Sequence, residues 1–539
     1  MNPSTTVSTL GRAAVGLALA LAAWGCQALT PDQARGLTAG DNDERIAALG
    51  ESLKRGDEGL APFLQALLAD SVRLAGPQVL VVQGGAARDA ATGAPAALPA
   101  DAEEVVNSNQ MRREIEGALA TLKLFSGDPA ERRAAVRSLG DEGVDEARLP
   151  LIEKALASET DAALAAQLGQ LRAAVRLTSS DPAARLEAAR ALAEGRAPST
   201  RSLLAERMKP ATEGGEPDTA VRGALSLSLR KVETRLAWGE RLGVLFTGLS
   251  LGSILLLVAL GLAITYGLMG VINMAHGELM MVGAYATFLT QNAFRAWLPA
   301  GAFDAYVLVA VPASFLAAAG VGAVMERAVI RWLYGRPLET LLATWGISLV
   351  LMQSVRSLFG AQNVPVENPA WLSGGVEVLG NLTLPFNRIA IVVFSLLVLG
   401  GVSLLMARTR LGLFVRGVTQ NRRMASCVGI DTARIDTFAF ALGSGLAGLA
   451  GCALSQLGNV GPDLGQGYIV DSFMVVVLGG VGQLAGTVYA ALGLGVLNKL
   501  LEGWQGAVLA KITVLVFIVA FIQKRPQGIF ALKGRSAEA

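Results

Sequence analysis

The only histidine of the chain, His276, lies two residues before Glu278 inside a long apolar region. The surrounding sequence, from Gly270 to Tyr285, reads G-V-I-N-M-A-H-G-E-L-M-M-V-G-A-Y. A carboxylate or an imidazole loses its hydration in hydrocarbon, so such residues usually face the interior of a helix bundle or a water-filled path. The pattern therefore predicts a solute path whose candidate lining is Asn273, His276, Gly277 and Glu278.

The residue types in this segment also predict its local structure. Gly270 and Gly277 allow the backbone to bend or separate, and Asn273 or His276 would cap the helix that follows. Glu278 would then lie in the first turn, where the helix dipole favours a negative charge. The alternative is that His276 and Glu278 only pin a broken helix near one membrane face, and the sequence leaves both interpretations open.

Other motifs argue against catalysis by this chain. Cys26, Cys427 and Cys452 are too few and too scattered for a disulfide framework, and the absence of C-x-x-C gives no sign of a metal site. No G-K dipeptide occurs, so a phosphate-binding loop is missing. We therefore expect no metal, no cofactor and no enzymatic activity.

Small residues recur at four-residue spacing in two apolar segments, a pattern that is typical of closely packed membrane helices. Two G-x-G-like stretches in these segments mimic a dinucleotide site, but neither lies in a soluble strand-turn-helix unit. The predicted packing residues are Gly443, Ala447, Gly451, Gly482 and Gly486.

Composition predicts a membrane protein with a polar amino-terminal part. The 539 residues are 52% hydrophobic and 17% charged, and the mean hydropathy is +0.47. Charges are dense from Asp32 to Arg241 and sparse from Leu242 to Ile522, which indicates two domains, 29–237 and 238–539. The net charge of +2 gives no reason to expect a nucleic-acid partner.

The second domain can be divided into about nine apolar segments of membrane-spanning length, so we expect an all-α polytopic fold embedded in lipid. Glycines and a proline interrupt the region from Gly458 to Gly486, which predicts that some helices are discontinuous. The expected spans are Leu242–Thr265, Asn273–Gln291, Ala305–Val329, Thr340–Phe359, Ile389–Ala407, Thr437–Leu457, Tyr468–Gly482, Gln483–Leu501 and Gly506–Gln523.

The charges around these spans predict their orientation. An apolar run from Ala13 to Ala23 follows Arg12, and no acidic residue precedes Asp32, so residues 1–28 are expected to be a cleaved signal peptide. With residues 29–237 exported, the alternate loops that become cytoplasmic are the basic ones, as the positive-inside rule requires. Their cations are Arg327, Arg331, Arg336, Arg408, Arg410, Arg416, Arg422, Arg423, Arg434, Lys524, Arg525, Lys533 and Arg535.

The exported domain carries an internal repeat. Segments beginning at Asp41, Asp128 and Asp181 align with Arg45, Arg132 and Arg185 in register, and a second helix is expected after each. Such units predict stacked helical hairpins of the HEAT type, with an irregular helical bundle as the alternative. An insertion that includes Q-V-L-V-V-Q from Gln78 predicts a small hairpin and a loop.

The longest basic loop, from Ala407 to Asp436, is expected to contain a short helix from Thr419 to Val428 that stops at Gly429. This helix would present Arg422, Arg423 and Ala425 to a partner. The alternative is that the arginines serve only to orient the spans.

Three segments together resemble the branched-chain amino acid type permeases of ABC importers, over Leu242 to the end of the chain. They are N-M-A-H-G-E-L-M-M-V-G-A-Y, N-R-R-M-A-S-C-V-G-I-D and V-V-V-L-G-G-V-G-Q-L-A-G. Within that family, an exported helical domain behind a signal peptide is similar to the long form of the urea permease subunit.

The resemblance implies a non-catalytic permease subunit for urea in a bacterial inner membrane, with the exported domain periplasmic and the carboxyl terminus cytoplasmic. It implies a heterodimer with a second related permease subunit, two cytoplasmic ATP-binding subunits and a periplasmic urea-binding protein. It also implies that the basic loop docks the ATPase through Arg416, Arg422, Arg423, Met424, Ala425 and Gly429. ABC coupling loops often have a glutamate followed by two alanines and later a glycine, whereas here Arg423 stands at the glutamate position and only Ala425 and Gly429 fit.

Two alternatives remain at this point. The solute could instead be a branched-chain or other amino acid, which would require separate binding sites for its carboxylate and its ammonium group. In a different class, the protein would be a receptor or scaffold whose exported solenoid binds a ligand, although one helix would then suffice as an anchor.

Overall fold

The structure, a computed structural model, describes residues 29–55, 59–83, 86–99, 102–142 and 148–530. The predicted signal peptide, 1–28, lies outside them. The chain divides into two compact units, Met1–Leu236 and Ala237–Ala539, which are described separately. The boundary falls within one helix, α11, which runs from Thr219 to Met269.

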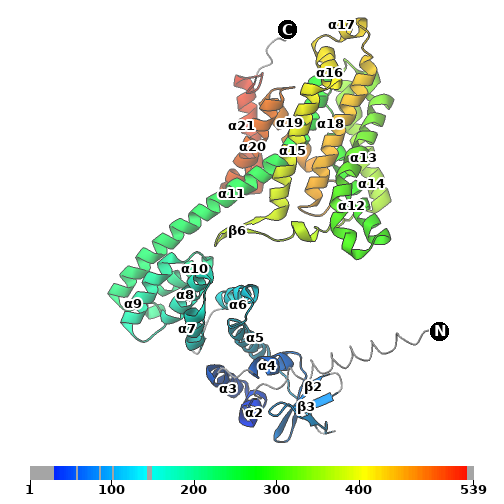
Figure 1. Cartoon of the computed structure of the whole chain (residues 1–539). Helices are drawn as coiled ribbons and strands as arrows, with labels where there is room; N and C mark the ends of the chain where they lie inside the picture. The colour runs from blue at the N-terminus through cyan, green and yellow to red at the C-terminus, as the bar shows by residue number, and fades with distance from the viewer. Residues whose placement is uncertain (1–28, 56–58, 84–85, 100–101, 143–147, 531–539) are drawn as a thin grey trace, which may run out of the picture. The chain divides into compact units, whose positions relative to one another are not determined.

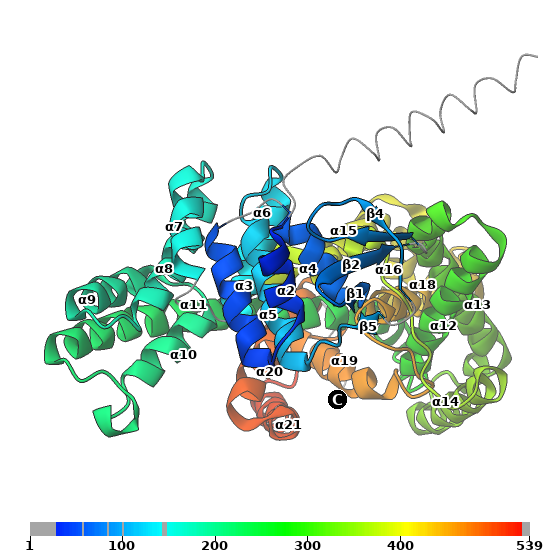
Figure 2. The ribbon, with the colours of Figure 1, turned by 90° about the horizontal axis from the view of Figure 1, so that it is seen from below.

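The first unit is built mainly of short helices, and α2, α3 and α5 lie side by side in it (Figures 1 and 2). Its helices before α11 are α2 (Pro31–Thr38), α3 (Asn42–Arg55), α4 (Leu60–Leu68), α5 (Asn109–Lys123), α6 (Pro129–Glu142), α7 (Leu149–Ser158), α8 (Ala162–Arg176), α9 (Pro182–Ala191) and α10 (Pro198–Arg207), with 3-10 turns η2 (Leu192–Glu194) and η3 (Ala211–Glu213).

Two of the three arginines that align in the sequence, Arg132 and Arg185, make equivalent contacts, whereas Arg45 donates to the Leu37 and Val106 carbonyls and to Asn107. Arg132 donates from Nε and Nη2 to Glu159 at 2.9 and 3.0 Å, and from Nη1 to the Ser126 carbonyl at 2.9 Å. The hydrogen bond from Arg132 holds the pKa of Glu159 below its usual value. The repeated arginine is therefore a structural residue that joins helices within one repeat.

The next repeat copies this arrangement. Arg185 donates to both oxygens of Glu216 at 2.9 Å and to the Ser179 carbonyl at 2.9 Å. Glu216 lies two residues before Asp218, which accepts hydrogen bonds from the first turn of α11. Each of these two repeats therefore contains three helices: α6, α7 and α8 in one, and α9, α10 and α11 in the next. The sequence analysis predicted hairpins of two helices and missed the third helix.

The insertion between α4 and α5 is larger than the predicted hairpin. It forms an antiparallel sheet in the order β4-β3-β2-β1-β5. The strands are β1 (Val72–Ala75), β2 (Gln78–Gln83), β3 (Ala86–Asp89), β4 (Pro95–Ala96) and β5 (Glu103–Glu104). Only Ala87 is buried in β3 and neither residue of β4 is, so no apolar pattern marked these two strands in the sequence.

The second unit is a bundle of long helices. They are the rest of α11, α12 (His276–Trp297), α13 (Tyr306–Ala328), α14 (Pro337–Phe359), α15 (Phe386–Arg408), α16 (Arg410–Gln420), α17 (Arg422–Cys427), α18 (Thr432–Ser455), α19 (Gln466–Gly479), α20 (Leu484–Gln505) and α21 (Ala507–Lys524), with 3-10 turns η4 (Ala300–Ala305), η5 (Ile330–Leu333) and η6 (Ala370–Leu372) and the hairpin β6 (Gly375–Leu379) and β7 (Leu382–Pro385).

Seven of the described helices are long and apolar enough to cross a membrane: α11, α13, α14, α15, α18, α20 and α21. Two further segments of the predicted nine form α12, with 22 residues, and α19, with 14 residues. A 14-residue helix covers about 21 Å, less than the roughly 30 Å of a hydrocarbon core. The total number of spans stays a prediction.

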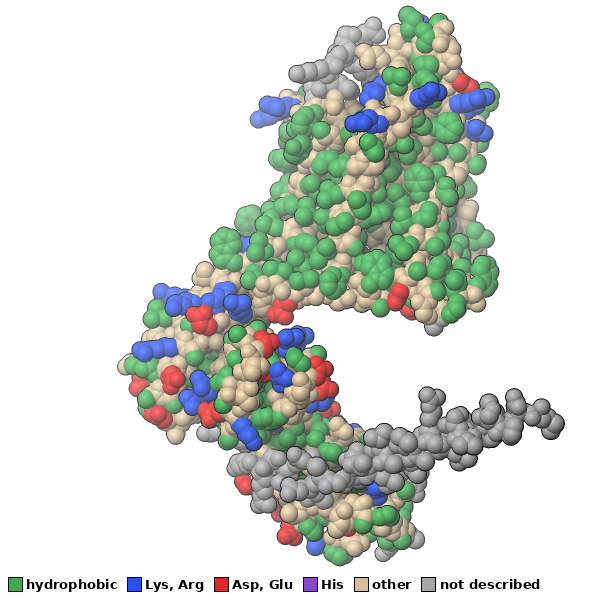
Figure 3. All heavy atoms as spheres, in the orientation of Figure 1, with side chains coloured by type: hydrophobic (Ala, Val, Ile, Leu, Met, Phe, Trp, Pro, Cys, Tyr) green, Lys and Arg blue, Asp and Glu red, His purple; other side chains and the backbone are tan. Residues whose placement is uncertain are grey.

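The surface of this unit matches a membrane environment. Hydrophobic side chains cover the flanks of the bundle, and lysines and arginines gather at the end that carries α16 and α17 (Figure 3). β6 lies at the opposite end (Figure 1).

Glycines allow close approach at the helix crossings of α18. A Cβ atom at Gly443 would lie 2.7 Å from the Gly261 carbonyl oxygen of α11, and one at Gly451 would overlap the Met280 carbonyl of α12. Ala447 between them is fully buried. These three residues lie where the sequence predicted close packing.

The other two predicted packing residues, Gly486 and Gly482, lie in different surroundings. Gly486 of α20 faces the backbone of Gly479 at the end of α19. Gly482, by contrast, lies in the turn between α19 and α20 with φ +78° and approaches Gly267 of α11. Gly482 therefore allows a turn to pack closely against α11 and is not part of a helix–helix crossing.

Candidate functional site

The chain is non-helical between α11 and α12, over residues 270–275. Gly270 has φ +65°, a left-handed conformation that glycine adopts without strain, and its N–H closes the end of α11 on the Tyr266 carbonyl at 2.9 Å. The hydroxyl of Thr344 on α14 accepts from the Met274 N–H at 3.2 Å and lies 3.4 Å from the Ile272 carbonyl. Backbone groups exposed by the break are thus satisfied by a neighbouring helix, as membrane interiors require.

Asn273 lies at the centre of this break and is 1% exposed. Its Oδ1 accepts from the Ala275 N–H at 3.1 Å, which forms a side-chain turn just before α12. The N-cap residue of α12 is Ala275, which makes no side-chain cap, so neither Asn273 nor His276 caps the helix as expected. The Nδ2 amide of Asn273 has no hydrogen-bond partner among the described residues.

His276 begins α12 and is fully buried against Gly261 of α11. Its Nε2 lies 3.1 Å from the Val258 carbonyl, and because a carbonyl only accepts, we assign the proton to Nε2. This bond ties the first turn of α12 to α11. The other ring nitrogen, Nδ1, has no partner within the described part of the chain.

Glu278 lies in the first turn of α12, as the sequence predicted, and is 2% exposed. Its Oε1 accepts from the Ser348 hydroxyl of α14 at 3.0 Å, whereas Oε2 has no partner in the described ranges. Arg356 and Asp463 act on this carboxylate through longer-range electrostatics.

Gly277 allows the start of α19 to pack against the start of α12. A Cβ atom at Gly277 would lie 2.7 Å from the Gly465 carbonyl oxygen, immediately before α19. The first turns of α12 and α19 are therefore in contact, and helix starts carry free N–H groups and partial positive charge. The junction thus combines helix starts with a free amide donor on Asn273 and a free carboxylate oxygen on Glu278.

The structure brings together all four predicted path residues, and it adds two that the sequence analysis missed. Thr344 and Ser348 lie one turn apart on α14, and their hydroxyls contact the break and Glu278 respectively. The available signal was two hydroxyl residues four positions apart in an apolar helix, which places them on one face.

The basic loop forms two helices, α16 and α17, separated at Asn421, where one helix from Thr419 to Val428 was predicted. The Asn421 side chain accepts from the Met424 N–H at 2.9 Å and so starts α17 as an N-cap. Gly429, with φ +88°, ends the segment as predicted, and the Ile430 N–H returns to the Ala425 carbonyl at 3.1 Å.

The exposure of the loop residues differs from expectation. Ala425 is 4% exposed, so it packs inside the loop and does not face a partner. Arg422 pairs with the buried Asp436 of α18, and its own side chain is still 43% exposed. The predicted coupling residues that the structure leaves exposed are Arg416, Arg422, Arg423, Met424 and Gly429.

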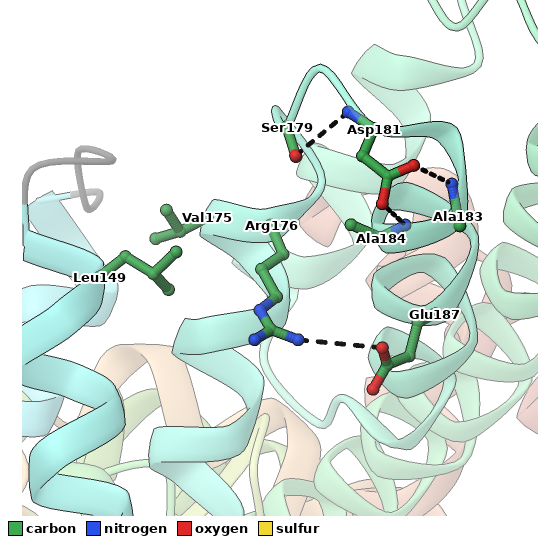
Figure 4. A pocket seen from close by; sticks show the side chains of 8 residues that line it. All are labelled: Leu149, Val175, Arg176, Ser179, Asp181, Ala183, Ala184 and Glu187. Carbon is green, nitrogen blue, oxygen red and sulfur yellow. Dashed lines mark hydrogen bonds and ion pairs between the residues drawn. The ribbon is translucent and has the colours of Figure 1, made fainter.

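The first unit contains a cleft of about 440 Å³ (Figure 4). Arg176 in this cleft pairs with Glu153 at 2.7 Å and with Glu187 at 3.8 Å. Asp181 accepts from the Ala183 and Ala184 N–H groups as the cap of α9. Within the part of the chain that the structure describes, Arg176 and Asp181 are thus engaged in structural contacts.

No group of three or more histidine, cysteine, aspartate or glutamate side chains in the described residues could hold a metal ion. The membrane-length helices and the buried polar break define an integral membrane protein of the transporter class. Residues 244–522 match the family model described as the branched-chain amino acid transport system permease component. The chain belongs to this family of ABC transporter permeases.

Known relatives match about half of the chain. The high-affinity branched-chain amino acid transport system permease protein BraD of Pseudomonas aeruginosa is 29% identical over 289 residues, which cover 53% of this chain and 94% of that protein. The permease protein LivH of Escherichia coli K12 is 27% identical over 292 residues, with 53% and 94% covered. The probable LivH of Methanocaldococcus jannaschii is 24% identical, with 54% and 92% covered. No solved structure matches the chain significantly.

Proposed function

We propose that this chain forms the membrane path of an ATP-driven urea importer. Among the buried polar atoms at the junction of α12 and α19 that have no partner in the described residues, Asn273 Nδ2 and Glu278 Oε2 carry the proposal. Urea has a carbonyl oxygen that accepts from an amide donor and amino groups that donate to a carboxylate. One donor and one acceptor at a break in the helices suit such a small neutral solute.

The proposed assembly follows from the resemblance and from the charge pattern. A second related permease would complete the path as a heterodimer, two cytoplasmic ATP-binding subunits would dock on α16 and α17, and a periplasmic urea-binding protein would deliver the solute. The exported domain, residues 29–237, would lie on the periplasmic side. Co-purification with two nucleotide-binding chains distinguishes this assembly from a receptor or scaffold anchored in the membrane.

Glu278→Gln tests the role of the free carboxylate oxygen. We expect uptake of radiolabelled urea to fall by about tenfold, because an amide in place of the carboxylate loses a charged hydrogen bond of roughly 1.5–3 kcal/mol. Uptake is measured in a deletion strain that carries the variant at matched membrane levels. The control is Glu377→Gln, which alters an exposed carboxylate of β6. Equal uptake by both variants would leave Glu278 with a pinning role only.

Branched-chain amino acids are the second candidate, because the family and the relatives above are described by that activity. A zwitterion needs charges of both signs, and both Arg356 and Asp463 act electrostatically on Glu278. Parallel uptake of radiolabelled leucine decides between the two solutes. Loss of leucine uptake on deletion, with urea uptake unchanged, would replace urea by an amino acid.

A further inference from the structure

A second buried polar cluster lies at the end of the bundle that carries α16 and α17. At its centre, the fully buried carboxylate of Glu326 on α13 accepts from the Thr437 hydroxyl of α18 at 2.6 Å and from the Tyr334 hydroxyl at 3.0 Å. Arg331 of η5 adds an ion pair at 3.3 Å. The carboxylate is therefore satisfied by three side chains from two segments, residues 330–334 and α18, as a buried charge requires.

The basic loop joins this cluster through Arg422. Its guanidinium pairs with Asp436, whose side chain is 3% exposed and which precedes Thr437 on α18. The same guanidinium lies over the ring of Tyr334, 5.0 Å from the centroid, in a cation–π contact. Tyr334 thus contacts Arg422 with its ring face and Glu326 with its hydroxyl.

Tyr334 also reaches the break described above. Its hydroxyl oxygen lies 3.3 Å from the Met269 sulfur, and Met269 is the last residue of α11. Met269, Val271 and Tyr334 pack in one apolar cluster. The side chain of Tyr334 is consequently in contact with the loop helix α17 on one side and with the start of the non-helical segment on the other.

We infer that Tyr334 is a positioning residue that links the state of the α16–α17 loop to the geometry of the break at residues 270–275. Displacement of Arg422 from Asp436 removes the cation from the Tyr334 ring and frees the ring to move against Met269. The segment that begins at Gly270 then shifts, and with it Asn273. This inference rests on the proposed function for its purpose, since it joins the loop that would dock the ATPase to the residues that would contact the solute.

The contacts alone do not establish coupling, which requires that a change at one end alters the other. We therefore test the link by thiol labelling, which needs neither urea nor ATP. Met274→Cys places a probe in the break at a half-buried position, in the full chain in native membranes with Cys26, Cys427 and Cys452 replaced by serine. The measured quantity is the rate at which a small maleimide labels Cys at position 274.

Adding Arg422→Ala is expected to change this labelling rate by about threefold or more. The matched control is Arg423→Ala, which removes the neighbouring arginine of the same helix, an exposed one, and should leave the rate unchanged. Arg422→Lys keeps a cation that can pair with Asp436 and lie over the Tyr334 ring, so it should leave the rate close to that of the parent.

Tyr334→Phe keeps the ring and removes only the hydroxyl, so it provides a mild second variant if Arg422→Ala fails to insert. It should also alter the rate, because the contacts to Glu326 and to Met269 are lost. Unchanged labelling in Tyr334→Phe, together with unchanged labelling in Arg422→Ala where that variant inserts, overturns the inference and leaves the cluster as local packing. Altered labelling without any urea uptake by the parent would retain the link while removing the proposed solute.

Discussion

At the scale of single residues, the informative atoms are buried polar atoms that lack a partner in the described chain. A buried donor or acceptor left unpaired costs roughly 1–3 kcal/mol, so its persistence calls for a reason. Asn273 Nδ2 and Glu278 Oε2 lie beside paired atoms of the same side chains, since Asn273 Oδ1 and Glu278 Oε1 are bonded. Each side chain is thus held by one atom and offers the other.

Thr344→Val should destabilise the break. The hydroxyl of Thr344 serves the Met274 N–H and the Ile272 carbonyl, and its loss leaves backbone groups unpaired at a cost of about 1–3 kcal/mol. The measurement is thermal unfolding of the detergent-solubilised protein. Ser354→Ala is the control on the same helix, because that exposed hydroxyl bonds only to the Val350 carbonyl one turn earlier. Equal melting temperatures for the two variants would contradict the bracing role of Thr344.

At the scale of elements, α18 is the helix around which the bundle closes. It packs against α12 and α13 and is buried along most of its length. Glycines at its crossings bring backbones within a distance that any side chain would prevent. Helix packing here depends on the absence of side chains at a few positions more than on apolar bulk.

Gly451→Ala should weaken this packing. The added methyl group would overlap the Met280 carbonyl of α12, and overpacking of this kind costs about 1–3 kcal/mol. A lower melting temperature and less protein in the membrane fraction are expected. Gly493→Ala in α20 adds the same methyl group where nothing lies within 4 Å, so it should be neutral or slightly stabilising. An unaffected Gly451→Ala variant would show that α18 and α12 can separate without loss.

At the scale of the whole molecule, charge and fold agree on two ends of the membrane unit. Exposed cations gather at the end with α16 and α17, and the hairpin of β6 and β7 lies at the other end (Figures 1 and 3). Gly239, near the start of this unit, packs against Asn381 of that hairpin. The positive-inside rule then predicts a cytoplasmic location for α17.

Cys427 allows a direct test of this orientation, because it is exposed in α17, whereas Cys452 is buried. In a Cys26→Ala background, a membrane-impermeant maleimide should label inverted vesicles and leave intact spheroplasts unlabelled. Glu377→Cys in β6, combined with Cys427→Ser, should give the opposite pattern. Labelling of Cys427 from outside the cell would reverse the proposed topology.

The sequence by itself determined the membrane class, the positions of most long helices and the break after α11. These follow from local composition, because hydropathy, glycine placement and charge act on neighbouring residues of the chain. The repeated arginines were also visible, and Arg132 and Arg185 make matching contacts in the structure. The third helix of each repeat was missed because it lies far along the chain from the aligned motif. The glutamate that precedes this helix and pairs with the repeated arginine is 27 or 31 residues from that arginine.

Only the tertiary structure decided which polar residues meet. Glu278 and Ser348 are 70 residues apart, and Glu326 and Thr437 are 111 apart, so no local pattern pairs them. The same holds for adjacent residues of one helix: Arg422 and Arg423 are both exposed, but Arg422 reaches the buried carboxylate of Asp436. Their roles differ because side-chain direction depends on how α17 packs against α18, which is a property of the folded chain and not of the order of its residues.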